Sequence, residues 1–219
     1  MNTVQPIRSL EKIKEIEIIL KSQSMRNYIL FRLGIYSGLR ISDILKLKVK
    51  DLRNQDYFIL KEKKTGKPKR LLIQPELKIE LNDYIKDMDD EDFVIGSREY
   101  KDTITITTKV KNENGKYRNV EQKIKNIASN SPLNRAQAWN ILNDVAKKVG
   151  INESIGTHSL RKTFSYWLYH YSNKDISLIQ KMLNHSSPQM TLRYIGILDD
   201  QIDDMISGFS YNNLQNIKI

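Results

Sequence analysis

Apolar residues recur every three to four positions along most of this chain, which is the spacing of helices that bury one face. The stretches with this spacing are residues 9–21, 41–47, 76–87, 131–148, 162–171 and 175–183. Residues 25–36 are more continuously apolar, so they predict a fully buried helix, which the pair Ser37-Gly38 ends. The pattern predicts a mixed fold that is mainly α-helical.

Two strand pairs interrupt the helical pattern. Residues 57–60 and 70–73 are rich in apolar residues and flank a polar turn, Lys64–Pro68, so they predict a small antiparallel β-sheet. Within residues 100–130, apolar and polar residues alternate on both sides of Asn114-Gly115, a sequence typical of tight hairpin turns. This segment is predicted to be an extra β-hairpin insert.

Ser followed by Pro marks two helix starts, because Ser caps a helix and Pro fits its first position. Ser131-Pro132 begins a helix that runs to Gly150, and its Trp139 and Ile141 are expected to face the core. Ser187-Pro188 begins another helix near the C-terminus.

Composition narrows the class of protein. The 219 residues are 39% hydrophobic, which is enough to build the core of one large domain. No run of 18 apolar residues is present and the first residues are not apolar, so neither a transmembrane helix nor a secretory signal is expected. With no Cys and three His, disulfides are excluded, and we expect no metal and no other cofactor.

Charge points to a polyanionic partner. The formal net charge is +10, from 36 Lys and Arg against 26 Asp and Glu. Residues 40–70 alone hold eleven basic and four acidic residues, a difference of +7. A basic face of this kind favours nucleic acid over an anionic membrane surface, because it matches a row of phosphates.

The C-terminal third concentrates the chemistry. If Ser159 caps a helix, His158 and Arg161 are three residues apart on one helical face. Tyr194 would lie about two turns into the helix that His185 precedes. This combination suits phosphate chemistry, since Arg grips two phosphate oxygens, His moves protons and a Tyr hydroxyl can act as a nucleophile.

Taken together, these residues resemble the tyrosine recombinase (phage integrase) family over about residues 6–197. The resemblance rests on five motifs in the family's order: Gly38-Leu39-Arg40-Ile41-Ser42-Asp43, Lys64-Thr65-Gly66, His158-Ser159-Leu160-Arg161, Leu183-Asn184-His185-Ser186-Ser187 and Thr191-Leu192-Arg193-Tyr194. Asn184 stands where the family has Gly, a mild departure because Asn also tolerates the left-handed conformation that ends a helix.

The resemblance implies the fold of the family's catalytic domain and a role for each motif. Tyr194 would attack a DNA phosphodiester and form a 3′-phosphotyrosyl link, while Arg40 and Arg161 hold the non-bridging oxygens. His158 would assist proton transfer at Tyr194, and His185 would donate to the phosphate.

The same resemblance names a general acid and a supporting acidic residue. Lys64 would protonate the leaving 5′-oxygen, and Lys63, one position earlier, is the alternative. Only one of the two can enter the site, because neighbouring strand residues point to opposite faces. Asp43 matches the acidic position that supports the site. The covalent link stores the energy of the phosphodiester, so neither ATP nor a metal is implied.

The implied partner is double-stranded DNA, bound as a homotetramer by a chain that is a monomer when free, with an accessory DNA-bending protein. No membrane partner is expected. The residues expected to contact DNA phosphates are Lys61, Lys63, Lys67, Lys69 and Arg70. The insert could extend the sheet, mediate assembly, decorate the surface, or contact DNA through Lys109, Lys111, Lys116 and Arg118.

The whole of residues 1–219 is expected to form a single catalytic domain, with the insert at 100–130. The tail at 199–219 would be a helix that docks on a neighbouring protomer. The chain is similar to the fimbrial-switch invertases, short members without the family's N-terminal core-binding domain. A cytoplasmic, nucleoid-associated location in a prokaryote, or a phage origin, follows from the resemblance.

Other interpretations stay open at this point. Alone, Arg40 could be a surface residue paired with Asp43, and Tyr194, one of eleven Tyr, could be a packing residue. A type IB topoisomerase shares the tyrosine chemistry. A non-catalytic DNA-binding regulator could keep the fold without the activity.

Overall fold

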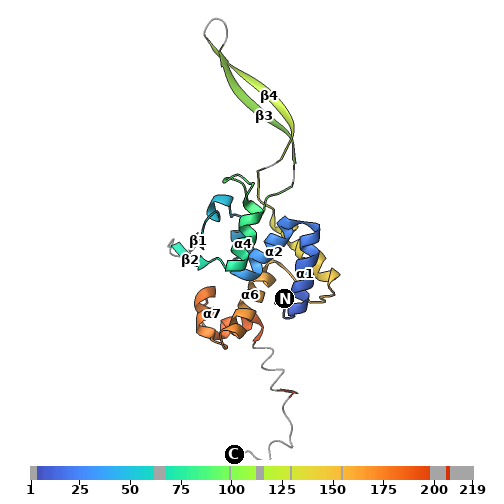
Figure 1. Cartoon of the computed structure of the whole chain (residues 1–219), viewed down its shortest axis with the longest axis vertical. Helices are drawn as coiled ribbons and strands as arrows, with labels where there is room; N and C mark the ends of the chain where they lie inside the picture. Colours follow the sequence, from blue (N-terminus) through green and yellow to red (C-terminus); the bar gives the residue numbers. More distant parts are fainter. Residues whose placement is uncertain are drawn as a thin grey trace, which may run out of the picture.

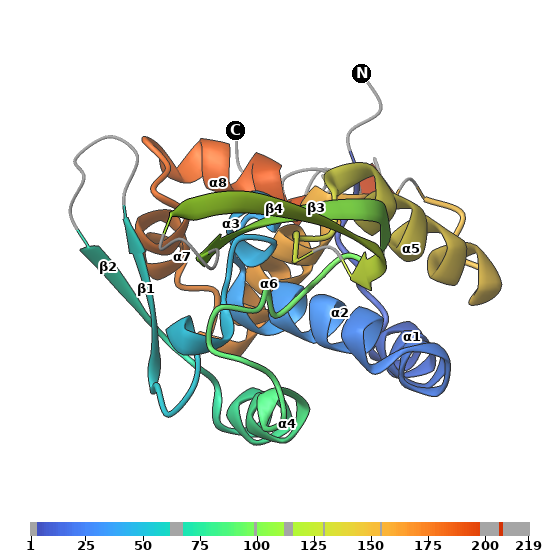
Figure 2. The same cartoon turned by 90° about the horizontal axis from the view of Figure 1, so that it is seen from above.

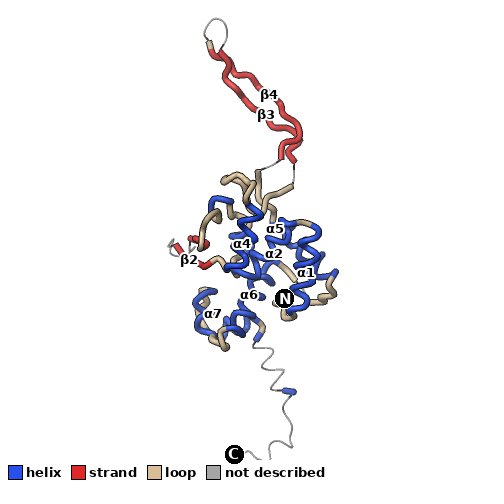
Figure 3. Tube along the Cα trace, in the orientation of Figure 1, coloured by secondary structure: helices blue, strands red, loops and turns tan. Residues whose placement is uncertain are grey.

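The computed structural model describes residues 4–61, 68–98, 100–111, 116–128, 130–153, 155–197 and 206–207. A helical body carries two separate β-hairpins, one short and one long (Figures 1 and 3). The helices are α1 Leu10–Gln23, α2 Met25–Ser37, α3 Ile41–Ile44, α4 Pro75–Ile85, α5 Arg135–Lys148, α6 Thr157–Tyr171, α7 Ile176–Leu183 and α8 Pro188–Ile195, with a 3₁₀ turn at Val49–Asp51. The predicted mixed, mainly helical fold class is confirmed.

Helix α2 lies at the centre of the body, as its continuous apolar sequence predicted. Ile29, Leu30 and Leu33 are fully buried, and helices α1, α4 and α6 pack around them. The helix ends at Gly38, whose φ of 60° is left-handed and therefore favours a residue without a Cβ.

One charged residue is buried in this centre. Arg32 is 5% exposed, and its guanidinium pairs with Glu17 of α1 at 2.8 Å and with Glu80 of α4 at 2.8 Å. It also lies 4.0 Å from the centroid of the Tyr36 ring. The paired carboxylates compensate the cost of burying this charge, and the three helices are joined through it.

Helices α2 and α6 approach each other closely. A Cβ at Gly34 would lie only 2.3 Å from Leu160, and one at Gly38 would lie 2.3 Å from Phe164. Two glycines on α2 therefore allow α6 to pack directly on its backbone, and α6 carries the His158 and Arg161 of the sequence analysis.

The N-terminal segment is bound to α6 and α8. The backbone N–H of Ile7 donates to the Thr163 hydroxyl at 2.8 Å, and Trp167 donates through its indole N–H to the Ile7 carbonyl at 3.0 Å. Arg8 donates to the carbonyl of Gly196, the residue that ends α8, at 3.3 Å.

A second, smaller apolar cluster places the last two helices. It contains the buried residues Tyr169, Ile179, Leu183, Ile195 and Ile197. The half-buried Tyr194 packs against it. The end of α6, α7 and α8 thus form one packed unit, in which α8 contacts both of the other helices.

The two hairpins form separate sheets. Strand β1 (Tyr57–Lys61) pairs with β2 (Pro68–Leu72), and β3 (Tyr100–Lys111) pairs with β4 (Tyr117–Ala128), both antiparallel. The insert is therefore confirmed as a hairpin, and among the described strands it does not extend the first sheet. It projects from the body as a long arm, seen from the side in Figure 1 and from above in Figure 2.

Three details of the sequence analysis were wrong. Helix α5 begins at Arg135 and not at Ser131-Pro132, because Pro132 pairs with Gly96 in a β-bridge and the side chain of Asn134 caps the helix. Trp139 does not face the core and is 50% exposed, whereas Ile141 does pack against it.

The third concerns the start of α6. Ser159 does not precede the helix but lies in its first turn, with Gly156 at the capping position, and its hydroxyl accepts a hydrogen bond from the Gly156 N–H at 3.1 Å. His158 therefore also lies within the helix. Among smaller differences, Pro68 begins strand β2 and does not belong to the turn.

The expected C-terminal helix lies almost wholly outside the described residues, of which only 206–207 belong to it. Within the described part of the chain, no helix is both long and apolar enough to cross a membrane.

Candidate active site

Arg40 stands at the junction between α2 and α3. It follows the left-handed Gly38 by two residues and occupies the position before the first turn of α3, where its side chain is exposed. Within residues 4–61, the side chains of Arg40 and Asp43 form no ion pair with each other, so the surface-pair interpretation loses its basis. Asp43 instead lies close enough to Arg161 to raise the pKa of that guanidinium.

Arg161 joins three parts of the body. From α6 it donates to the Gly38 carbonyl at the end of α2 and to the Leu183 carbonyl at the end of α7, the latter at 3.3 Å. Burial lowers its pKa, and the positive charge of Arg40 lowers it further. Two guanidiniums are thus held near each other, an arrangement that an anion between them would stabilise.

His158 lies one turn before Arg161 on α6. Its side chain still meets solvent, but the surrounding protein displaces enough water to lower the pKa of the imidazole. The charges of Arg135, Arg161, Arg40 and Lys162 lower it further. His158 is therefore uncharged at neutral pH and able to accept a proton.

His185 follows Asn184, which ends α7 in the predicted left-handed conformation with φ 58°. Its Nδ1 lies 3.1 Å from the Thr191 hydroxyl, which itself donates to the Ser187 carbonyl at 3.2 Å. Because that hydroxyl proton is already used, its oxygen accepts from Nδ1–H of His185. The neutral imidazole then presents an unprotonated Nε2.

Burial and the charges of Arg161 and Arg40 lower the pKa of His185 as well. His185 is uncharged in the free protein at neutral pH. A phosphate next to it would offset the two arginines and favour a protonated Nε2 that donates to a phosphate oxygen.

Tyr194 occupies the second turn of α8, as the spacing predicted. Its ring meets that of His185 edge to face, with centroids 5.1 Å apart. Burial raises the pKa of the phenol, while Arg161, which interacts with it, and Arg40 lower that pKa. The phenol is neutral at rest, but it lies where cations stabilise its anion.

The basic hairpin is described only in part. The predicted phosphate-contacting residue Arg70 is exposed on β2, with its guanidinium 4.0 Å from the Tyr57 ring centroid. Lys61 and Lys69 belong to β1 and β2, but the positions of their side chains are not described. Lys63, Lys64 and Lys67 lie outside the described residues, so the choice between Lys63 and Lys64 stays a prediction.

Figures 1 and 2 both place strands β1 and β2 on the same side of the body as α7. The short hairpin therefore lies on the side where His185 and Tyr194 are held.

Three residues near the site were missed by the sequence analysis. Thr191 orients His185, Arg135 acts on His158 from the start of α5, and Lys162 lies with its Nζ 5.2 Å from the Tyr194 ring centroid. Thr191 belongs to the quoted motif that contains Tyr194, and Lys162 follows Arg161 directly. Their positions in or next to the motifs could therefore have identified these two residues from the sequence.

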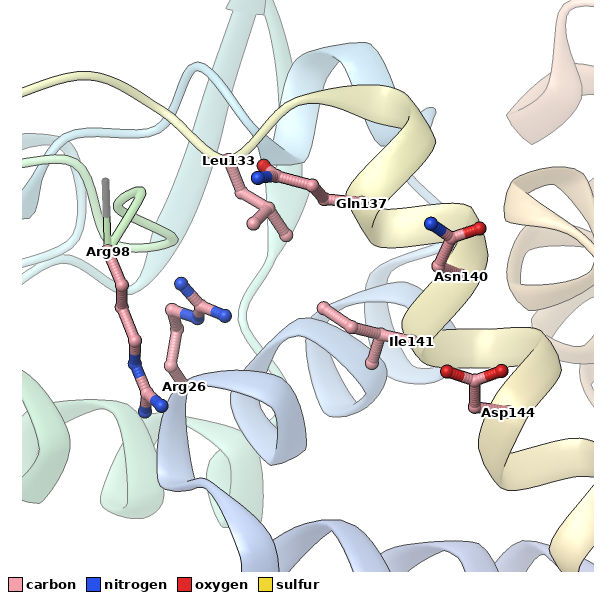
Figure 4. Close-up of a pocket in the computed structure, with 7 residues that line it drawn as sticks. All are labelled: Arg26, Arg98, Leu133, Gln137, Asn140, Ile141 and Asp144. Carbon is pink, nitrogen blue, oxygen red and sulfur yellow. The ribbon is translucent and has the colours of Figure 1, made fainter. Parts of the chain in front are cut away.

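A pocket elsewhere on the body shares no residue with this group. It measures about 370 Å³ and lies between the start of α2 and one face of α5, where Gln137, Asn140 and Asp144 line it (Figure 4). Its two arginines are already engaged, Arg26 with the Gly96 carbonyl and Arg98 with the Ser24 hydroxyl, each at 2.8 Å.

The group formed by Arg40, His158, Arg161, His185 and Tyr194 is suited to an anion. Arg40 and Arg161 act electrostatically on both imidazoles and on the Tyr194 phenol, and Asp43 acts on Arg161. Among the described residues, no cluster of His, Asp and Glu has the geometry to hold a metal ion. A phosphate group is an anion that this distribution of donors fits.

Comparison with known proteins agrees with this chemistry. A model of the Phage integrase family matches residues 7–200. The chain is 42% identical over 200 residues to the Probable integrase/recombinase YoeC of Bacillus subtilis (strain 168), covering 91% of this chain and 93% of that protein. It is 24% identical over 208 residues to Tyrosine recombinase XerA of Pyrococcus furiosus, covering 94% of this chain and 62% of that protein.

Solved structures show the same fold. The crystal structure of XerA recombinase matches with a TM-score of 0.63 and 20% identity, over 95% of this chain and 68% of that one. A lambda integrase tetramer bound to a Holliday junction matches with a TM-score of 0.58 and 14% identity, over 89% and 49%. With the family matched over nearly the whole described body, the chain belongs to the phage integrase family of tyrosine recombinases.

Proposed function

We propose that this chain is a site-specific recombinase that cuts and rejoins double-stranded DNA, with Tyr194 as the residue that becomes linked to the cut strand. Membership of the family supplies the enzyme class, a DNA breaking and rejoining enzyme. The proposal adds the residue roles. The observation that supports them is the placement of the Tyr194 phenol beside Arg161 and Arg40, in ring contact with His185.

In the first step, the phenol oxygen of Tyr194 forms a bond to phosphorus as its proton leaves, with neutral His158 as the base that assists. The bond between phosphorus and the 5′-oxygen breaks, and that oxygen takes a proton from the general acid. The products are a 3′-phosphotyrosyl link and a free 5′-hydroxyl. A 5′-hydroxyl from another strand then reverses the chemistry and exchanges partners.

The cations act on the charge that develops at phosphorus. Arg40 and Arg161 hold the non-bridging oxygens, and His185 donates from Nε2 once it is protonated. Donors aimed at a transition state are each worth roughly 10²–10³ in rate. Lys64 is the proposed general acid for the 5′-oxygen, Lys63 its rival, and Asp43 the residue that keeps Arg161 in place.

The DNA partner is supported by the neighbours, since the lambda integrase of the matched structure is bound to a Holliday junction as a tetramer. We extend both points to this chain as proposals: double-stranded DNA as the substrate, and a homotetramer as the active assembly on it. An accessory DNA-bending protein, docking of the 199–219 tail on a neighbour, a single catalytic domain over 1–219 and nucleoid association stay predictions.

The decisive experiment traps the covalent intermediate. Nicked suicide duplexes that lose a short strand after cleavage are tiled from DNA flanking the gene, and a denaturant-resistant protein–DNA band is sought. The band should form with the native chain and vanish in Tyr194→Phe, which removes only the hydroxyl. A band that persists in Tyr194→Phe contradicts the nucleophile assignment.

The two alternatives predict other results. A non-catalytic regulator would bind these duplexes without forming a band in any variant. A type IB topoisomerase would form the band on duplexes of unrelated sequence. The relatives and structures reported above are named integrases or recombinases, which favours neither alternative.

A further inference from the structure

Lys162 is a buried cation next to the phenol of α8. It follows Arg161 on α6 and is 8% exposed, among the most buried charged side chains of the described body. Its Nζ lies 5.2 Å from the centroid of the Tyr194 ring, on the ring face. The same ring also meets the imidazole of His185 in a T-shaped contact, so Tyr194 has both an imidazole and an ammonium as neighbours.

This contact changes in strength when Tyr194 loses its proton. A neutral ring attracts a cation through its quadrupole. A phenolate carries a full negative charge that extends into the ring, and at this burial the attraction is much larger than it would be in water. Lys162 therefore favours the ionised form over the neutral form.

From this geometry we propose that Lys162 is a positioning residue for the nucleophile, which holds the Tyr194 ring and stabilises its developing phenolate during attack. The inference rests on the proposed role of Tyr194. Arg161 interacts with the phenol and would also bind the phosphate, whereas Lys162 would act only on the group that attacks it.

The rival role for a lysine at this site is protonation of the leaving 5′-oxygen. In an in-line displacement, the attacking and leaving oxygens lie on opposite sides of phosphorus. A side chain in contact with the ring of the attacking residue is therefore on the wrong side for the leaving oxygen. The geometry assigns Lys162 to the nucleophile and leaves the leaving group to another residue.

The first test compares Lys162→Met, which keeps the length and removes the charge, with Lys162→Arg, which keeps the charge. Lys181→Met on α7 is the matched control, because Lys181 is exposed. Single-turnover formation of the covalent band is measured from about pH 6 to 9. Lys162→Met should lower the rate at neutral pH at least tenfold, or about 1.4 kcal/mol, and move its rise to higher pH. Lys162→Arg and Lys181→Met should stay near the native rate.

A duplex with sulfur in place of the bridging 5′-oxygen separates the two roles. Sulfur leaves without a proton, so it restores variants that lack the general acid and does not restore variants with an impaired nucleophile. Lys162→Met should stay slow on this substrate. Full recovery would overturn the assignment and make Lys162 the acid.

A second measurement does not need DNA and so separates this inference from the proposed function. Tyr residues labelled with ¹³C at Cζ are titrated by NMR, with Tyr194 assigned from Tyr194→Phe. Removing the neighbouring charge should raise the pKa of Tyr194, and Lys162→Arg should not. An unchanged Tyr194 titration in folded Lys162→Met or Lys162→Gln contradicts the inference, whether or not any duplex is cleaved.

Discussion

Arg161 donates a hydrogen bond to the carbonyl of Gly38, a residue 123 positions earlier in the chain. The bond brings the end of α2, and with it Arg40, to the face of α6 that carries His158. Gly38 can accept it because its φ of 60° turns the backbone out of the helix. The relative positions of both arginines therefore depend on one glycine.

Gly38→Ala should unfold more easily than the native chain. A Cβ would be strained at this φ and would lie 2.3 Å from Phe164. The expected loss is about 2–5 kcal/mol, the sum of left-handed strain and overpacking, measured by urea unfolding.

Gly150→Ala provides the matched control for that measurement. Gly150 is also left-handed, with φ 71°, but a Cβ added there would meet nothing within 4 Å. The free energy of unfolding of Gly150→Ala should fall only by the cost of left-handed strain, about 1–2 kcal/mol. Equal losses at both glycines would show that the contact with Phe164 does not constrain α6.

Thr191→Val should slow DNA cleavage without unfolding the chain. Thr191 is fully buried, and Val matches its shape but cannot accept a hydrogen bond from Nδ1 of His185. Loss of that bond frees the imidazole to turn or change tautomer, and the rate of covalent band formation should fall about tenfold. Thr191→Ser keeps the hydroxyl and should stay near the native rate; if it fell equally, packing rather than the hydrogen bond would be responsible.

Stability should fall as the pH drops below neutrality. Burial and nearby cations lower the pKa of His158 and His185, so the unfolded chain binds protons there at a higher pH than the folded chain does. The contribution of these histidines to the free energy of unfolding is fully present above about pH 7. It declines as the pH falls through the pKa of the unfolded state, near 6.5, towards the lower pKa values of the folded state.

Urea unfolding across that pH range measures this slope. The double variant His158→Gln and His185→Gln should flatten it. If the slope persists in the double variant, groups other than His158 and His185 take up the protons on unfolding.

Most of the β3–β4 hairpin should be removable without unfolding the helical body. Lys101 and Ile127 are directly paired across β3 and β4, so Asn-Gly can join them in place of residues 102–126. The residues of the two apolar clusters all lie outside this segment. The free energy of unfolding should stay within about 0.5 kcal/mol, and the covalent band should still form.

The arm-less chain also tests what the insert contributes. The arm-less chain could bind DNA less tightly than the native chain, with a difference in affinity that shrinks as the salt concentration rises. That result would assign phosphate contacts to the basic residues of the arm. These are the exposed Lys109, Lys111, Lys116 and Arg118. Unchanged affinity would leave assembly or surface decoration as its role.

The sequence was sufficient where one local rule decides the structure. The Ser187-Pro188 pair predicted the start of α8, and Asn184 predicted the left-handed end of α7. Alternation around Asn114-Gly115 predicted the strands of the arm. In each case the deciding atoms lie within a few residues of one another.

The sequence was not sufficient where contacts with residues far away in the chain decide the structure. Pro132 could begin a helix, but pairing with Gly96 draws it into a bridge. Trp139 looks like a core residue, yet it lies on a side of α5 that faces solvent and is itself 50% exposed. The role of Lys162 depends on α8 lying against α6, which no pattern of spacing reveals.

The attachment of the N-terminal segment to the last helices has a consequence during synthesis. Ile7 and Thr163 are 156 residues apart, and Arg8 and Gly196 are 188 apart. Helices α1, α2 and α4 can pack on the ribosome as soon as they emerge, but these closures need the far end of the chain. A nascent chain therefore carries Arg40 long before it carries Tyr194, and the two side chains can come together only after α8 has been synthesised.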